Sequence, residues 1–398
     1  MAADWPPNVH GASAWGSRPR LSAGIDARNA CWGGSPMLVD GQPRRSLWPT
    51  AQRDALMVID QRQLPHAFAI ERLDSVQAVF VAIRDMWVRG APLIGATAAY
   101  GLALQARSDA SDKALQAAMD KLASARPTAV NLAWALQRMH QRLLPLPAGQ
   151  RAAAAWHEAE TMADEDVATN RAIGRHGLQL LRALVPRRPG PLNLLTHCNA
   201  GWLATVDWGT ALAPVYQAQA AGMDIHVWVD ETRPRNQGAS LTAWELGQQR
   251  VAHTLAADNA GGHLMQRGWV DAVIVGCDRV SANGDVCNKI GTYLKALAAR
   301  DNGVPFYVAM PLSTLDLALH DGLGQIPIEQ RSARELTHIS GRAASGDWVE
   351  VQLAPDGCVA ANPAFDVTPA ALVSALITER GVVPAQPDAL RALAEQAA

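Results

Sequence analysis

The chain has 398 residues, of which 49% are hydrophobic and 18% are charged, and it carries a formal net charge of −2 at pH 7. This composition predicts a globular protein long enough for two domains, or for one large domain with an extension. The net charge gives no electrostatic case for nucleic acid or an anionic membrane as a partner, and no run approaches the roughly 20 apolar residues of a membrane span.

Residues 1–45 are rich in Pro, Gly, Ser, Ala and Arg and have no sustained periodicity, so we expect a mobile extension. The N-terminus lacks a basic segment followed by an apolar core, which argues against a secretory signal. The cysteines are scattered and form no CxxC pair, which favours reduced thiols in a cytoplasmic compartment and no structural zinc site. They are Cys31, Cys198, Cys277, Cys287 and Cys358.

Residues 46–188 predict a smaller N-terminal domain with short strands and a helical bundle. One or two strands are expected within 47–64, for example at 55–60. Apolar residues at helical spacing predict a helix over 75–87, and Ser75 is a suitable N-cap. After a break at 89–92, further helices are expected at 93–105, 110–125, 130–143 and 152–184.

A proline-rich segment at 186–191 marks the boundary of a second domain, which we place at 189–385, with a short helical tail at 386–398. Apolar runs alternate with helical spacing, which predicts a doubly wound, Rossmann-like parallel α/β sheet. Each run ends in a polar cluster, and ligands bind beyond the carboxyl ends of such strands, so we expect one site there. The runs are 192–195, 225–229, 270–275 and 304–309.

Cys198 and Asp278 directly follow two of these runs. Loop amides and a following helix could make Cys198 a usable thiolate, although a buried structural cysteine is equally compatible with the pattern. An apolar setting should raise the pKa of Asp278 and suit it to general acid catalysis. A salt bridge to Arg279 or a helix-capping role is the alternative for Asp278.

The segment 282–291 is expected to turn at Asn283-Gly284 and to open a helix capped by Asp285. Asn288 and Lys289 would then lie in the first helical turn, where free amides favour an anion. There is no Walker loop and no GxGxxG, which argues against a nucleotide triphosphatase or a dinucleotide enzyme.

Arg89 and Arg126 lie at helix breaks, where their planar guanidinium groups could bind phosphate, although most surface arginines are only solvated. Gln237 lies at a loop-to-helix entry beside the sheet end. A capping role for Gln237 and a contact with substrate are equally compatible with this position.

Taken together, ten colinear segments closely resemble the S-methyl-5-thioribose-1-phosphate isomerase family, the aldose–ketose isomerases of methionine salvage. The resemblance covers residues 46–385, and broader relatives include regulatory subunits of a translation initiation exchange factor and ribose-1,5-bisphosphate isomerases. The matching segments are VRGAP (88–92), RPTAVN (126–131), THCNAG (196–201), DETRP (230–234), QGA (237–239), LTAWEL (241–246), DR (278–279), NGD (283–285), NKIGTY (288–293) and NPAFDVTP (362–369).

The resemblance implies a catalytic pair, Cys198 and Asp278, and a set of substrate-binding residues. Those residues are Arg89, Gly90, Ala91, Arg126, Gln237, Asn288 and Lys289. Two positions depart from the family: Ser240 replaces an arginine, and Cys277 replaces a small residue.

The resemblance further implies a sugar phosphate substrate, a homodimer, and no cofactor or metal. Cys198 would carry a proton between C2 and C1 through an enolate, or a hydride would shift between these carbons. Two other functions remain open on the sequence. One is an isomerase of 5-deoxyribose 1-phosphate or ribose 1,5-bisphosphate, and the other is a non-catalytic, metabolite-sensing regulatory protein of the same fold.

Overall fold

The computed structural model describes residues 37–127 and 129–395. Most of the expected extension 1–45, with Cys31, lies outside the described residues. Its last part forms a two-stranded hairpin of β1 (Leu38–Val39) and β2 (Gln42–Pro43). All described residues belong to one compact unit, so the division proposed at residue 188 would fall within that unit.

The first half contains a three-stranded antiparallel sheet and a helical bundle, as the sequence predicts. Ser75 caps the first helix by accepting a hydrogen bond from the Ala78 backbone N at 3.2 Å, which confirms the predicted N-cap. Strand β5 was not predicted. The elements are β3 (Leu47–Pro49), β4 (Leu56–Ile59), β5 (Ile70–Leu73), α1 (Val76–Arg84), α2 (Ala91–Ser108), α3 (Asp112–Ala123), α4 (Val130–Leu143) and α5 (Ala148–Arg182).

The second half is built on a seven-stranded sheet in the order β18-β17-β12-β9-β6-β7-β8, in which only β18 runs antiparallel to its neighbour. The four predicted apolar runs are confirmed as strands, because residues buried on both faces of a parallel sheet are almost all apolar. The strands are β6 (Leu192–Thr196), β7 (Ile225–Asp230), β8 (Ala252–Ala256), β9 (Ala272–Val275), β12 (Phe306–Ala309), β17 (Ala375–Thr378) and β18 (Gly381–Val383).

The strand order confirms the doubly wound, Rossmann-like prediction. From β6 the chain adds β7 and β8 on one side, and then returns to add β9, β12 and β17 on the other. The direction of winding therefore reverses between β6 and β9, which pair in parallel through Leu194–Ala272 and Leu195–Val273. Ligands bind at such a switch point, beyond the carboxyl ends of the two strands.

Helices cover both faces of this sheet because side chains alternate along each strand. Leu194 belongs to the core under α5, α6 (Ala213–Ala220) and α7 (Ala243–Gln248). Leu195 belongs to the opposite core, under α8 (Ala260–Gln266), α9 (Thr292–Asp301) and α12 (Pro387–Glu395), the helix predicted for the C-terminal tail.

A smaller four-stranded sheet corrects one expectation from the sequence. Residues 286–289 form a strand, β11, and the helix α9 begins only at Thr292, so Asn288 and Lys289 do not lie in a first helical turn. The turn at Asn283-Gly284 reverses the chain into a hairpin instead of starting a helix, and the Asp285 carboxylate accepts from Ala370 N. The sheet order is β13 (Leu315–Asp316), β10 (Arg279–Ser281), β11 (Val286–Lys289) and β16 (Phe365–Thr368).

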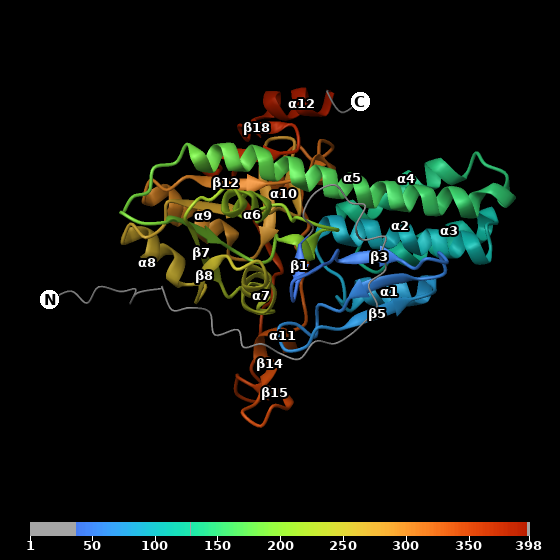
Figure 1. Cartoon of the computed structure of the whole chain (residues 1–398), viewed down its shortest axis with the longest axis horizontal. Helices are drawn as coiled ribbons and strands as arrows, with labels where there is room; N and C mark the ends of the chain where they lie inside the picture. Colours follow the sequence, from blue (N-terminus) through green and yellow to red (C-terminus); the bar gives the residue numbers. More distant parts are fainter. Residues whose placement is uncertain (1–36, 128, 396–398) are drawn as a thin grey trace. The chain divides into compact units, whose positions relative to one another are not determined.

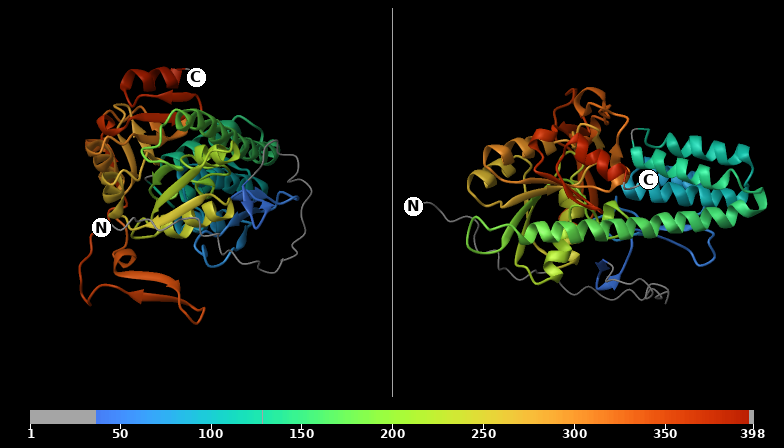
Figure 2. Two further views of the ribbon diagram at one scale, coloured as in Figure 1. Left: turned by 60° about the vertical axis from the view of Figure 1, so that its left-hand side comes forward. Right: turned by 90° about the horizontal axis from the view of Figure 1, so that it is seen from above.

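A hairpin of β14 (His338–Arg342) and β15 (Trp348–Gln352) extends away from the sheets (Figures 1 and 2), and two one-turn helices, α10 (Gly322–Gln325) and α11 (Arg334–Thr337), precede it. Within the described ranges, none of the helices has the length and apolar character that crossing a bilayer demands.

Helix α5 joins the two halves of the molecule. It runs beside α2 and α4 at one end and beside α6 at the other (Figures 1 and 2). Trp156 and Met162 belong to the core of the helical bundle, whereas Ile173 and Leu181 belong to a core of the parallel sheet. Because α5 is shared by both cores, it fixes the helical bundle against the edge of the sheet where the site is expected.

The contact of α5 with α6 depends on Gly177. A Cβ atom at this position would lie 2.3 Å from Pro214 Cγ, so Gly177→Ala must push the two helices apart. We expect the free energy of unfolding to fall by about 1–3 kcal/mol, the usual cost of overpacking.

The matched control is Gly149→Ala in the first turn of the same helix, where nothing lies within 4 Å of the added atom. This change should be neutral or stabilise by up to about 1 kcal/mol through helix propensity. Urea unfolding of both variants measures the difference, and equal stabilities would contradict the close contact.

Candidate active site

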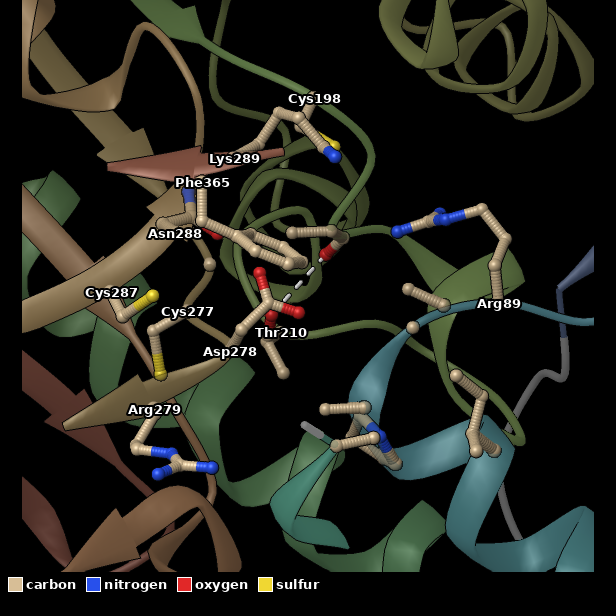
Figure 3. Close-up of a pocket in the computed structure, with 18 of the residues that line it drawn as sticks. Arg89, Cys198, Thr210, Cys277, Asp278, Arg279, Cys287, Asn288, Lys289 and Phe365 are labelled. Atoms are coloured by element: carbon tan, nitrogen blue, oxygen red, sulfur yellow. Dashed lines mark hydrogen bonds between the residues drawn. The ribbon is translucent and has the colours of Figure 1, made fainter. Parts of the chain in front are cut away.

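The structure brings all nine residues expected at the site to the wall of one pocket. The pocket lies at the switch point between β6 and β9, and the N-terminal ends of α2 and α4 close its other side. Which role each residue has remains a prediction. Figure 3 labels Arg89, Cys198, Asp278, Asn288 and Lys289, and the other four are Gly90, Ala91, Arg126 and Gln237.

Cys198 follows β6 and is a free thiol with 7% of its surface exposed. Its φ is +67°, a left-handed conformation that is uncommon for a residue other than glycine. Two buried hydroxyls hold this conformation. Thr232 Oγ1 accepts from Cys198 N at 2.8 Å, and Thr242 Oγ1 donates to Cys198 O at 2.7 Å. Strained backbone that the surroundings fix in this way is typical of functional sites.

Asp278 follows β9, and its side chain points into the same cavity as Cys198 (Figure 3). Burial raises the pKa of the Asp278 carboxyl, as the sequence predicted, while the positive charges of Lys289, Arg89 and Arg126 oppose the shift. A helix-capping role is excluded because the strand β10 follows directly. Arg279 forms an ion pair with Asp316 at 3.6 Å.

Arg89, Gly90 and Ala91 form the N-terminal end of α2. Gly90 has a φ of +95°, and a Cβ atom there would lie 2.3 Å from Ala204 O, so only glycine lets the helix end approach the loop after β6 this closely. No side chain caps the first turn of α2. The pocket is therefore lined by a helix N-terminus without a side-chain cap, but that helix is α2 and not the one that the sequence placed at Lys289.

Arg126 and Gln237 each have a buried polar atom that lacks a partner among the described residues. These atoms are Arg126 Nε and Gln237 Oε1. Arg126 Nη2 pairs with Glu329 at 3.3 Å. Gln237 precedes a π-helical turn, Gly238–Thr242, but its side chain makes no capping hydrogen bond. Unsatisfied buried groups are costly, so their presence in a pocket favours contact with a ligand over a capping role.

Asn288 and Lys289 reach the pocket from β11. Asn288 Nδ2 donates to Thr292 Oγ1 at 3.1 Å, and the Lys289 ammonium lies 4.7 Å from the centre of the Phe365 ring. Burial lowers the pKa of Lys289, while the charges of Cys198 and Asp278 act in the opposite direction. Lys289 therefore lies within electrostatic reach of both members of the expected catalytic pair.

Sequence reasoning missed a buried ionic cluster beneath Cys198. His197 Nδ1 lies 2.9 Å from Asp230 Oδ2, and its Nε2 lies 2.8 Å from the Ile290 carbonyl oxygen. Because a carbonyl oxygen only accepts, Nε2 must carry a proton. Lys295 Nζ lies 3.1 Å from the same Asp230 oxygen. His197, which precedes Cys198, is thus hydrogen-bonded to Ile290, which follows Lys289. In the sequence, the position of His197 beside Cys198 was the one sign of this contact.

His197, Asp230 and Asp258 offer ligand atoms within 4.8 Å of one another, a spacing that could hold a metal ion. Lys295 already supplies a cation here, because its ammonium lies against Asp230 and donates to the Asp258 carbonyl oxygen at 2.6 Å. Lys295 and His197 thus share one oxygen of Asp230, while the Asp258 carboxylate accepts from Thr232 N and Arg233 N at 2.7 Å each.

The two departures from the family pattern have different surroundings. Ser240 does not line the pocket, and its hydroxyl donates to Asn236 O at 2.7 Å. Cys277 does line the pocket, beside Thr314 Oγ1 at 3.3 Å, and burial raises the pKa of its thiol to about 12. Cys277 is therefore a neutral thiol at physiological pH.

Comparison with known proteins gives consistent matches over most of the chain. Residues 87–385 match the Initiation factor 2 subunit family. A methylthioribose-1-phosphate isomerase of Acidiphilium cryptum is 62% identical over 358 residues, which cover 90% of this chain and 97% of that protein.

Two crystal structures are similar to this fold. The 5-methylthioribose 1-phosphate isomerase of Pyrococcus horikoshii has a TM-score of 0.77 and 41% identity, covering 89% of this chain and 97% of its own. A structure described as the translation initiation factor eIF-2B subunit delta from A. fulgidus has a TM-score of 0.72 and 40% identity, covering 87% of this chain and 99% of its own.

The buried cluster makes a testable prediction for Lys295→Met. Asp230 is fully buried, and Lys295 and His197 are its partners within this cluster. Removal of the Lys295 ammonium therefore leaves the His197 imidazole as the one partner of the Asp230 carboxylate in the cluster. We expect a loss of about 3–5 kcal/mol in the free energy of unfolding, which is typical of a broken buried ion pair.

The double variant Lys295→Met, Asp230→Asn should recover part of this loss, because the uncompensated charge is gone while an oxygen remains to accept from His197. Chemical denaturation of the single and double variants measures the recovery. A double variant that is less stable than either single variant would contradict the ion pair.

Proposed function

This chain belongs to the Initiation factor 2 subunit family, and from its similarity to isomerases of that kind we propose that it is a methylthioribose-1-phosphate isomerase. This membership, together with 62% identity to a methylthioribose-1-phosphate isomerase, confirms the resemblance of the sequence motifs. The reaction is an aldose–ketose isomerisation of S-methyl-5-thio-α-D-ribose 1-phosphate to S-methyl-5-thio-D-ribulose 1-phosphate, a step of methionine salvage. The observation that carries the proposal is a thiol and a pKa-raised carboxyl that face one pocket together with three cationic side chains.

The substrate phosphate would bind at the N-terminal end of α2. There the uncapped first-turn amides and the Arg89 guanidinium offer several hydrogen-bond donors to an anion. Arg126 and Lys289 add positive charge from α4 and β11. The buried Gln237 Oε1, which lacks a partner among the described residues, would accept a hydrogen bond from a sugar hydroxyl.

Asp278 would open the sugar ring. The anomeric oxygen carries phosphate, so the ring cannot open by loss of a hydroxyl proton and needs an acid at the ring oxygen instead. The raised pKa of Asp278 keeps a proton available for this transfer, after which the C1–O4 bond breaks.

Cys198 would complete the isomerisation. As a thiolate it would take the proton from C2 to give an enolate and return it to C1, while the C2 hydroxyl gives its proton to the Asp278 carboxylate and becomes the ketone. In the rival route a hydride moves from C2 to C1, and the two side chains handle only oxygen-bound protons. Deuterated water separates the routes, since only the enolate route carries solvent hydrogen to C1.

We also propose a cytoplasmic homodimer. Leu294 and Leu297 are 61% and 39% exposed on α9, which supports a further protein contact at this helix. The free thiols among the described residues fit a reducing compartment. Sedimentation velocity of the full chain tests the assembly.

The decisive experiment compares three substrates. The purified chain should convert S-methyl-5-thioribose 1-phosphate with a higher kcat/KM than 5-deoxyribose 1-phosphate or ribose 1,5-bisphosphate, measured as ketose formation. Faster turnover of either rival would reassign the substrate. Binding of all three without conversion would instead support a regulatory protein.

The catalytic pair is tested by Cys198→Ser and Asp278→Asn. Each should lower kcat by about 10²–10⁴-fold, the range for loss of an acid or base, with KM nearly unchanged. In the wild type, kcat/KM should fall as the pH rises through the pKa of Asp278, because the acid then loses its proton.

The matched control is Cys358→Ser, which alters an exposed cysteine and should keep full activity. Retained turnover in Cys198→Ser or Asp278→Asn would remove that residue from the mechanism.

A further inference from the structure

Asn199 connects the arginine at the pocket to a buried carboxyl group. Arg89 Nη1 donates to Asn199 Oδ1 at 2.5 Å, and Arg89 Nη2 donates to the Asn199 backbone oxygen at 2.9 Å. On its other side, the Asn199 amide donates to Glu245 Oε1 at 2.8 Å. Asn199 therefore accepts two of the hydrogen bonds of the Arg89 guanidinium, although the two residues are 110 positions apart in the sequence.

The same asparagine connects to the peptide of Cys198. Asn199 Nδ2 also contacts Thr242 Oγ1 at 3.1 Å, and this hydroxyl donates to Cys198 O at 2.7 Å. The amide that orients Arg89 thus also reaches the hydroxyl that fixes the left-handed backbone of Cys198.

Glu245 anchors this network without reaching the pocket. It is fully buried on α7, and its Oε2 accepts from Leu203 N at 3.2 Å. A Cβ atom on Gly201 would lie 1.6 Å from Glu245 Oε1, so the loop after β6 has room for the carboxyl only because residue 201 is glycine. Glu245 is not among the residues that line the pocket, so it acts through Asn199 and not on the substrate.

We propose that Asn199 and Glu245 are positioning residues that hold Arg89 and the Cys198 peptide in one fixed relation, so that phosphate binding and the thiol depend on the same network. This inference rests on the proposed function only for the identity of the substrate. The hydrogen-bond network itself is independent of that function, and its effect on anion binding can be measured separately.

The test is a double-mutant cycle of Arg89→Ala and Asn199→Ala, with kcat and KM for S-methyl-5-thioribose 1-phosphate. Asn199→Ala alone should raise KM by about tenfold, a coupling typical of residues in one hydrogen-bond network. In the Arg89→Ala background the same change should raise KM less than about threefold, because the arginine it orients is absent. A purely structural role predicts equal effects in both backgrounds, and that result would overturn the proposal.

The conservative variant Glu245→Gln keeps one oxygen acceptor and should raise KM less than Asn199→Ala does. Asn170→Ala is the matched control, since Asn170 is equally buried on α5 and does not line the pocket, and it should leave KM unchanged. If Asn199→Ala does not fold, the KM of Glu245→Gln decides, and a wild-type value overturns the proposal.

Calorimetric titration of the same variants with inorganic phosphate separates this inference from the proposed function. Weaker phosphate binding by Asn199→Ala than by wild type supports the network even if the sugar is not converted. Unchanged phosphate affinity in Asn199→Ala and Glu245→Gln overturns it, whatever the enzyme turns over.

Discussion

The parallel pairing of β6 with β9 is the constraint on which the whole site depends. These strands are neighbours in the sheet although almost 80 residues separate them, and their pairing places the ends of both at one edge. Cys198 follows the first strand and Asp278 the second, so the thiol and the carboxyl face one pocket without any direct bond between them. A shift of one strand by one residue would turn its side chains to the opposite faces of the sheet and separate the two groups.

Burial and the neighbouring cations have opposite effects on the Asp278 carboxyl. Burial raises the pKa of Asp278, whereas Lys289, Arg89 and Arg126 partly offset the shift by favouring the carboxylate. A phosphate that pairs with these cations would cancel their effect on Asp278 and raise its pKa further. The acid would therefore hold its proton most firmly when the proposed substrate is bound, which is when ring opening needs it.

The sequence predicts the elements whose signal is local. The run ending at Val275 reads as a strand because nearly all its residues are apolar, and the helix Val130–Leu143 has the predicted bounds because its apolar residues repeat at helical spacing. Asn288 and Lys289 were misassigned because their short strand is stabilised by pairing with Phe365–Thr368, a partner about 75 residues away. The pairing of Asp230 with Lys295 was missed for the same reason, since no local spacing connects these residues.

The location of the arginines explains why the helical first half is part of the site. Arg89 precedes α2 and Arg126 precedes α4, whereas the thiol, the acid and Lys289 come from the α/β half. The α/β half alone would hold the thiol and the carboxyl proposed for proton transfer but lack two of the three cations proposed to bind phosphate. Since α5 packs in the cores of both halves, the same helix that stabilises the fold also helps to set the distance between the arginines and the proposed catalytic pair. The proposed boundary at residue 188 therefore separates a helical half from an α/β half, but the pocket is lined by residues from both halves.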